Sequence, residues 1–166
     1  MEWFEPGWMA QARQEIEEYN TAYMSCLTEF GVEGGLIVGG GVALKEPVDE
    51  NGAPLPGMRE QNEAAMTECD SRVAVPEIWT LPADGETYQR MIDVRECLLS
   101  EGYAVPEPPS AEVWMEQGQK GPAWSPYVAI FSDPDSPDFI HISEDELSRL
   151  NAVCQQSGNG GFFVLP

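Results

Sequence analysis

The sequence predicts an α+β protein built from two repeated helix-strand-helix units around a small sheet, with one disulfide expected in each unit. Three observations lead to this prediction. The phrase Cys-Leu-Thr-Glu-Phe-Gly at residues 26–31 returns as Cys-Leu-Leu-Ser-Glu-Gly at residues 97–102. Apolar residues with helical spacing precede both phrases, and a second cysteine-bearing helical pattern follows each. We therefore expect a single compact domain over residues 1–166, with repeat units at about 7–74 and 83–157.

The first helix is expected to begin near Pro6 or Gly7 and to end at Gly31. Its apolar or small residues fall on one helical face, at Ala12, Ile16, Tyr19, Tyr23, Cys26, Leu27 and Phe30. Gly31 follows the last of these, where a left-handed C-terminal cap favours a residue without Cβ. The repeated phrase therefore marks a helix end.

A hairpin and a second helix complete the first unit. Residues 36–38 and 42–44 are apolar and flank three glycines, which is typical of a β-hairpin. The segment does not match a phosphate-binding loop, because Leu44 stands where the third glycine of that motif is required. Helical spacing then resumes at Met58, Asn62, Ala65, Met66, Cys69 and Val73.

The second unit begins with a helix that Asp84 is expected to cap and Gly102 to end. Its broad apolar face consists of Tyr88, Met91, Ile92, Val94, Leu98 and Leu99. Extended segments are expected at residues 103–105 and 138–142, and a short helix over 110–117 with Ser110 as its N-cap. Ser143 and Glu146 predict a capping box before the last helix, which carries Leu147, Leu150, Val153 and Cys154.

The four cysteines are expected to form disulfides rather than a metal site. They include no C-x-x-C pair, and the chain has a single histidine, so zinc and iron-sulfur spacings are absent. The economical pairing is Cys26 with Cys69 and Cys97 with Cys154, although the sequence leaves the other two connectivities open. Each bridge would contribute about 4 kcal/mol in the chain-entropy model. Disulfides indicate an extracytoplasmic protein, whereas four buried thiols would fit a cytosolic one.

Composition excludes several classes of partner. Hydrophobic residues make up 42% of the 166 positions, enough for a sizeable core, and the formal net charge is -21. Such a charge repels nucleic acid and anionic membrane surfaces and favours cations and basic proteins. No apolar run is long enough to span a membrane. The first residues lack the features of a signal peptide, so we expect either a cytosolic protein or one whose signal has been removed.

Residues 97–110 read Cys-Leu-x-x-Glu-Gly-Tyr-x-Val-Pro-Glu-Pro-Pro-Ser, and Trp124-Ser-Pro-Tyr127 and a cysteine-bearing helix follow. The first half carries the matching Cys26-Leu-x-x-Phe-Gly-Val and Glu68-Cys69. Over about residues 15–156 the chain resembles a group of uncharacterised secreted proteins and lipoproteins of actinobacteria. The resemblance implies an exported, envelope-associated protein with two disulfides, and it implies no activity. A lipid anchor is expected only in a native precursor, because no lipobox cysteine stands near the start.

Two groups of residues are candidates for binding. Aromatic residues near the ends and around 124 could form a partner surface or fill the core, and they are Trp3, Phe4, Trp8, Trp124, Phe162 and Phe163. Asp133, Asp135 and Asp138 could form a weak calcium site or a proline-rich turn. They do not form an EF-hand, because Pro137 and Asp138 occupy its fifth and sixth positions.

We expect a non-enzymatic, exported cell-envelope protein that binds a protein or a cell-wall component. The alternatives are a carboxylate-based hydrolase of cell-wall glycans and a calcium-dependent binding module. No catalytic residue is assigned, since nothing in the sequence places a serine or cysteine beside His141, which is expected on an edge strand. We expect no cofactor, except calcium if the protein is a calcium-dependent binding module.

Overall fold

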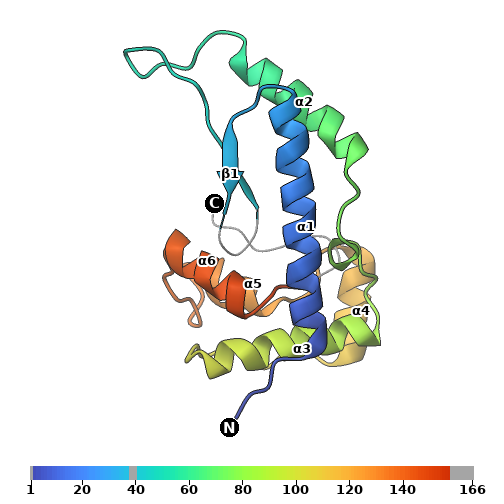
Figure 1. Cartoon of the computed structure of the whole chain (residues 1–166). Helices are drawn as coiled ribbons and strands as arrows, with labels where there is room; N and C mark the ends of the chain where they lie inside the picture. Colours follow the sequence, from blue (N-terminus) through green and yellow to red (C-terminus); the bar gives the residue numbers. More distant parts are fainter. Residues whose placement is uncertain (1, 38–40, 158–166) are drawn as a thin grey trace.

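A computed structural model describes residues 2–37 and 41–157 of the chain (Figure 1). Its elements in chain order are α1 (Gly7–Glu29), β1 (Gly34–Leu36), β2 (Val42–Leu44), α2 (Met58–Arg72), the 3₁₀ helix η1 (Glu77–Trp79), α3 (Gly85–Ser100), α4 (Ala111–Lys120), α5 (Pro126–Phe131) and α6 (Glu144–Val153). The architecture is mixed, with helices and one small antiparallel sheet of two strands. None of the helices in the described ranges combines the length and apolar character that crossing a membrane requires.

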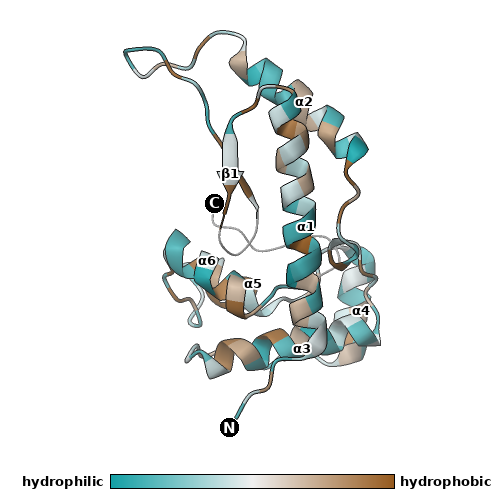
Figure 2. Ribbon diagram, viewed as in Figure 1, coloured by the Kyte–Doolittle hydropathy of each residue, from teal (hydrophilic) through white to brown (hydrophobic). Residues whose placement is uncertain are grey.

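Helix α1 runs past almost every other element (Figure 1). Its first turn contributes Met9 to a large cluster with α3, α5 and α6. Its middle contributes Ala12 and Ile16 to a small cluster with Ile78. Its last turns contribute Tyr23, Cys26 and Leu27 to a third cluster with α2. Figure 2 shows hydrophilic and hydrophobic residues interspersed along the longer helices, as expected for helices that bury only one face.

Both repeated phrases end their helices in the same way. Gly31 and Gly102 have φ angles of 76° and 93°, in the region that favours glycine. After α1, the Val32 N–H donates to the Leu27 carbonyl and the Gly31 N–H to that of Thr28. After α3, the Tyr103 N–H and the Gly102 N–H make the equivalent pair of bonds. These are Schellman ends, so the predicted glycine caps are confirmed.

The disulfides Cys26–Cys69 and Cys97–Cys154 are both present, which confirms the predicted pairing. The first joins the end of α1 to α2, where the Tyr23 hydroxyl also donates a 2.9 Å hydrogen bond to Asp70. The second joins α3 to the end of α6. All four cysteines are buried, so each bridge lies inside a hydrophobic cluster.

The hairpin forms, but β1 begins two residues earlier than the sequence predicts. Gly34 pairs with Leu44 and Leu36 with Val42. A Cβ atom at Gly34 would lie 2.4 Å from the Ala43 carbonyl oxygen, so the close approach of the two strands requires glycine there. Val38, predicted to end the first strand, lies outside the described residues, as do two of the three turn glycines.

The two predicted strands of the second unit are wrong, because residues 103–105 and 139–142 have no regular secondary structure and Asp138 lies in a turn. Arg95 donates to the carbonyl oxygens of Val105 and Pro106 at 3.1 and 2.9 Å, which occupies acceptors that a strand partner would use. Prolines 106, 108 and 109 lack the N–H that a sheet ladder needs. His141 is therefore exposed on coil and not on an edge strand.

The structure does not support a strict internal repeat. In the second unit the described chain between the two cysteine-bearing helices forms α4 and α5, and the sheet belongs to the first unit alone. Helix α5 was missed by the sequence prediction; it starts with Pro126 at its first position, where a missing N–H costs nothing. The repeat is thus limited to helix ends and disulfides.

The predicted N-caps are confirmed. Asp84 accepts a hydrogen bond from the Thr87 N–H, Ser110 from that of Val113 and Ser143 from that of Glu146. In the predicted capping box, however, the Glu146 side chain bonds to Tyr103 and Arg149. The Glu146 carboxylate therefore makes tertiary contacts instead of the local bond to the helix N-terminus that a capping box requires.

We expect Gly34→Ala to destabilise the hairpin by about 1–3 kcal/mol, because its Cβ would overlap the Ala43 carbonyl. Gly35→Ala is the matched control, since nothing lies within 4 Å of a Cβ there. Chemical denaturation, together with hydrogen exchange of the amides of residues 34–37 and 41–44, would measure the difference. Equal behaviour of the two variants would contradict the pairing described here.

Candidate functional site

The predicted aromatic surface residues do not form one exposed patch. Trp3, Trp8 and Trp124 are half-buried against the large cluster, whereas Phe4 is 75% exposed. The Trp8 indole donates a 2.7 Å hydrogen bond to Asp93, and Arg90 lies over its ring at 5.3 Å. Phe162 and Phe163 lie outside the described residues. Trp3, Trp8 and Trp124 therefore contribute to the packing of the fold.

The acidic loop after α5 forms a local turn. Asp133 accepts a hydrogen bond from the Asp135 N–H at 3.0 Å, and the Asp138 N–H donates to the Ser136 hydroxyl at 3.2 Å. These are the side-chain-to-backbone bonds that stabilise turns. Within residues 2–37 and 41–157, no group of three or more His, Cys, Asp or Glu side chains is placed to hold a metal ion.

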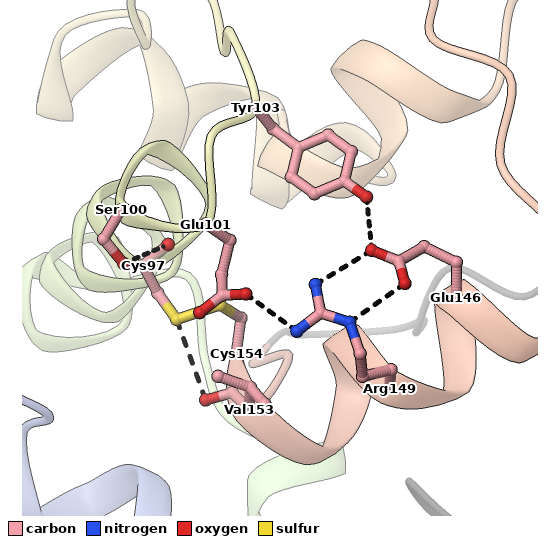
Figure 3. Close-up of polar contacts among 8 residues, drawn as sticks. All are labelled: Cys97, Ser100, Glu101, Tyr103, Glu146, Arg149, Val153 and Cys154. Atoms are coloured by element: carbon pink, nitrogen blue, oxygen red, sulfur yellow. Dashed lines mark hydrogen bonds and ion pairs between the residues drawn. A yellow bond between two sulfur atoms is a disulfide. The ribbon is translucent and has the colours of Figure 1, made fainter.

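A network of ionisable side chains joins α3 to α6 beside the Cys97–Cys154 disulfide (Figure 3). Arg149 donates to Glu101 at 2.8 Å and to both carboxylate oxygens of Glu146 at 2.9 Å. The Tyr103 hydroxyl donates to Glu146 at 2.5 Å. The hydrogen bonds from Arg149 and then Tyr103 lower the pKa of Glu146 to about 2. Burial and the bond to Glu146 raise the pKa of Tyr103.

This network is suited to holding structure and not to proton transfer. A general acid in glycan hydrolysis needs a carboxyl group whose pKa is raised. The pKa of Glu146 is shifted in the opposite direction, as is that of Asp84, chiefly because of its bond from the Thr87 N–H. Neither carboxyl therefore fits the acid of the hydrolase alternative. Nearby, the buried Tyr127 hydroxyl donates to the Cys154 carbonyl at 2.7 Å, which further fixes this end of α6.

A pocket of about 360 Å³ lies between α1, the hairpin and the end of α6. Its volume is near the lower end of the range typical of small-molecule sites, about 300–1,000 Å³. The residues that line it are Arg13, Ile16, Glu17 and Asn20 of α1, Leu36, Ile37 and Gly41 of the hairpin region, and Asn151, Ala152 and Gln155 at the end of α6. Both units therefore contribute walls to the same pocket.

One polar group of a residue that lines the pocket has no partner in the protein. One terminal nitrogen of Arg13 pairs with Glu5, whereas its Nη1 atom is buried and has no hydrogen-bond partner. An unpaired polar group that is buried costs about 1–3 kcal/mol. Asn20, which is 5% exposed, lines the same pocket and adds an amide to its wall. Such groups around a cavity favour a polar ligand.

A second hollow, of about 280 Å³, is lined by residues that include Trp8, Asp84, Glu86 and Arg90. Here its arginine and two of its acidic residues already have partners, because Arg90 pairs with Glu86 at 3.0 Å and Asp84 caps α3. The pocket beside Arg13 is therefore the stronger candidate site.

Sequence reasoning missed this pocket. Arg13, Ile16, Glu17 and Asn20 follow the i, i+3, i+4, i+7 spacing of one helical face, and the mixture of opposite charges with an apolar residue was the available signal. That the hairpin and α6 enclose this face could not be inferred from the sequence.

No protein-family model, curated protein or solved structure matches this chain. Its function must therefore be argued from its own residues.

The network around Glu146 predicts a loss of stability in acid. Because the folded pKa of about 2 is lower than that of an ordinary glutamate, Glu146 stabilises the fold at neutral pH, and this contribution disappears as the pH falls from about 5 towards 2. Glu146→Gln should lower the stability at pH 7 and flatten its pH dependence in that window. Unfolding by denaturant at a series of pH values would measure both effects.

Glu144→Gln is the matched control, since Glu144 lies in the same first turn of α6 and outside the network. We expect it to keep the wild-type slope. A wild-type slope in Glu146→Gln would show that the network does not couple to folding.

Proposed function

We propose that this protein is an exported, non-enzymatic binding protein of the cell envelope, and that it binds its partner in the pocket between α1, the hairpin and α6. The observation that carries the proposal is that Arg13, whose buried Nη1 atom has no hydrogen-bond partner, and the 5% exposed Asn20 line the same pocket. Groups that lack partners in the free protein gain hydrogen bonds when a polar ligand enters.

The two disulfides support the location. They indicate an oxidising, extracytoplasmic environment, because cytosolic reductants keep such cysteines as thiols. The strongly negative charge, -21, supports a partner that is neither nucleic acid nor an anionic lipid surface. A cell-wall component or an envelope protein that inserts a small polar group fits both properties.

The location is tested by peptide mapping without reduction of the natively expressed protein. We expect the links Cys26–Cys69 and Cys97–Cys154, because both pairs lie in buried clusters that bring the sulfur atoms together. Four free thiols would contradict export.

The binding site is tested by retention of envelope material on the immobilised protein. Ile37→Asp places a charge at the pocket wall and should abolish retention, whereas Val128→Asp changes an equally exposed residue on α5, outside the pocket lining. Wild type and Val128→Asp should then retain the same material. No retention by any of the three would refute the binding function, and equal retention by all three would refute the pocket.

A further inference from the structure

One charged residue of the pocket, Arg13, has a hydrogen-bond partner for only one of its two terminal nitrogens. Arg13 pairs with Glu5 through its Nη2 atom, and its buried Nη1 atom has no hydrogen-bond partner. A guanidinium group has five N–H donors, so an arginine with one carboxylate partner can bond to a second. Arg13 is therefore a binding group for a ligand carboxylate.

An acidic residue lies one turn further along α1. Glu17 is exposed, lines the same pocket and makes no ion pair with any residue that the structure describes. Side chains four residues apart on a helix have Cβ atoms about 5–6 Å apart, close enough to contact two charged groups on one small molecule. Glu17 can thus bind a ligand ammonium while Arg13 binds its carboxylate.

The amide of Asn20 can bond to the carboxylate or to the ammonium of such a ligand. It lies one turn beyond Glu17 in a residue that is 5% exposed, so a ligand atom that reaches it is largely removed from water. An amide has both donors and an acceptor, and it can complete the hydrogen bonding of a carboxylate or an ammonium.

The remaining wall is partly apolar, and the end of α6 adds the polar residues Asn151 and Gln155. Its apolar residues include Ile16 of α1, and Leu36 and Ile37 of the hairpin region, which are 52% and 42% exposed. These two side chains gain burial if an aliphatic group enters the pocket. The site therefore combines an opposite pair of charges with an apolar surface.

The charges of the whole protein and of the pocket together favour a ligand without net charge. A simple anion would be repelled by a molecule of charge -21, and a simple cation, which that charge attracts, could not accept a hydrogen bond from the Nη1 atom of Arg13. A zwitterion avoids both costs.

Resting on the proposed function, we propose that the pocket binds a free α-amino acid with an aliphatic side chain. Arg13 holds its carboxylate, Glu17 holds its ammonium, and Ile16, Leu36 and Ile37 contact its side chain.

Isothermal titration calorimetry of the full chain with leucine and three analogues tests the ligand class. Leucinamide lacks the carboxylate, N-acetylleucine lacks the ammonium and glycine lacks the side chain. We expect leucine to bind and each analogue to bind at least about 10-fold more weakly, since a hydrogen bond to a charged group contributes about a decade in affinity. Failure of leucine to bind, or equal binding of leucinamide, would overturn the proposal.

Variants test the residues. Arg13→Gln and Glu17→Gln should each weaken leucine binding at least about 10-fold. Glu5→Gln, which removes the partner of Arg13, and Glu18→Gln, which removes a neighbouring charge outside the pocket lining, should not weaken it. Circular dichroism would establish that every variant keeps its helices. Wild-type affinity in Arg13→Gln, or an equal loss in Glu18→Gln, would refute the assignment.

Different results would refute the proposed ligand class and the proposed binding function. If leucine does not bind while Ile37→Asp still abolishes retention of envelope material, the amino-acid class is wrong and the pocket stands. If wild type retains nothing, the binding function itself is wrong.

Discussion

Burial of one face of α1 is the constraint on which the rest of the structure depends. In proteins most of the stability of a helix comes from packing of its apolar face, and the 23-residue α1 buries such a face. Here Met9, Ile16 and Leu27 enter three separate hydrophobic clusters, so each part of the chain packs on a different segment of the same helix. The position of the pocket follows, because its polar residues lie along the middle of α1, between the two disulfide-linked units.

Both disulfides stabilise the walls of this pocket. Cys26–Cys69 joins α1 to α2 at the end from which the hairpin leaves. Cys154 lies between Ala152 and Gln155, both of which line the pocket, so the bridge to Cys97 fixes the opposite wall. In the proposed function, export and ligand binding are physically related, since an oxidising environment supplies the cross-links that hold the candidate site.

The few basic residues of this acidic chain have different environments. Arg59, Arg90 and Lys120 each pair with a glutamate one helical turn away, and such exposed pairs contribute little individually. Arg149 is different, because it joins carboxylates at the end of α3 and on α6 beside a buried disulfide (Figure 3). Arg13 differs again, because one of its nitrogens lacks a partner in the protein.

The sequence favoured the cysteine pairing that the structure shows but left the two other connectivities open. By itself it determined α1, α2, α3, α4 and α6, the N-caps of α3, α4 and α6, and the glycine ends of α1 and α3. These features depend on residues a few positions apart, as when Asp84 bonds to the Thr87 N–H or Gly31 adopts a positive φ. Only the tertiary structure decided that residues 103–105 form no strand, where Arg95 occupies the Val105 carbonyl oxygen, and that Glu146 binds Arg149 and not its own helix cap. The pocket belongs to this second group as well. Its residues come from α1, the hairpin and α6, and only long-range packing brings these three segments together.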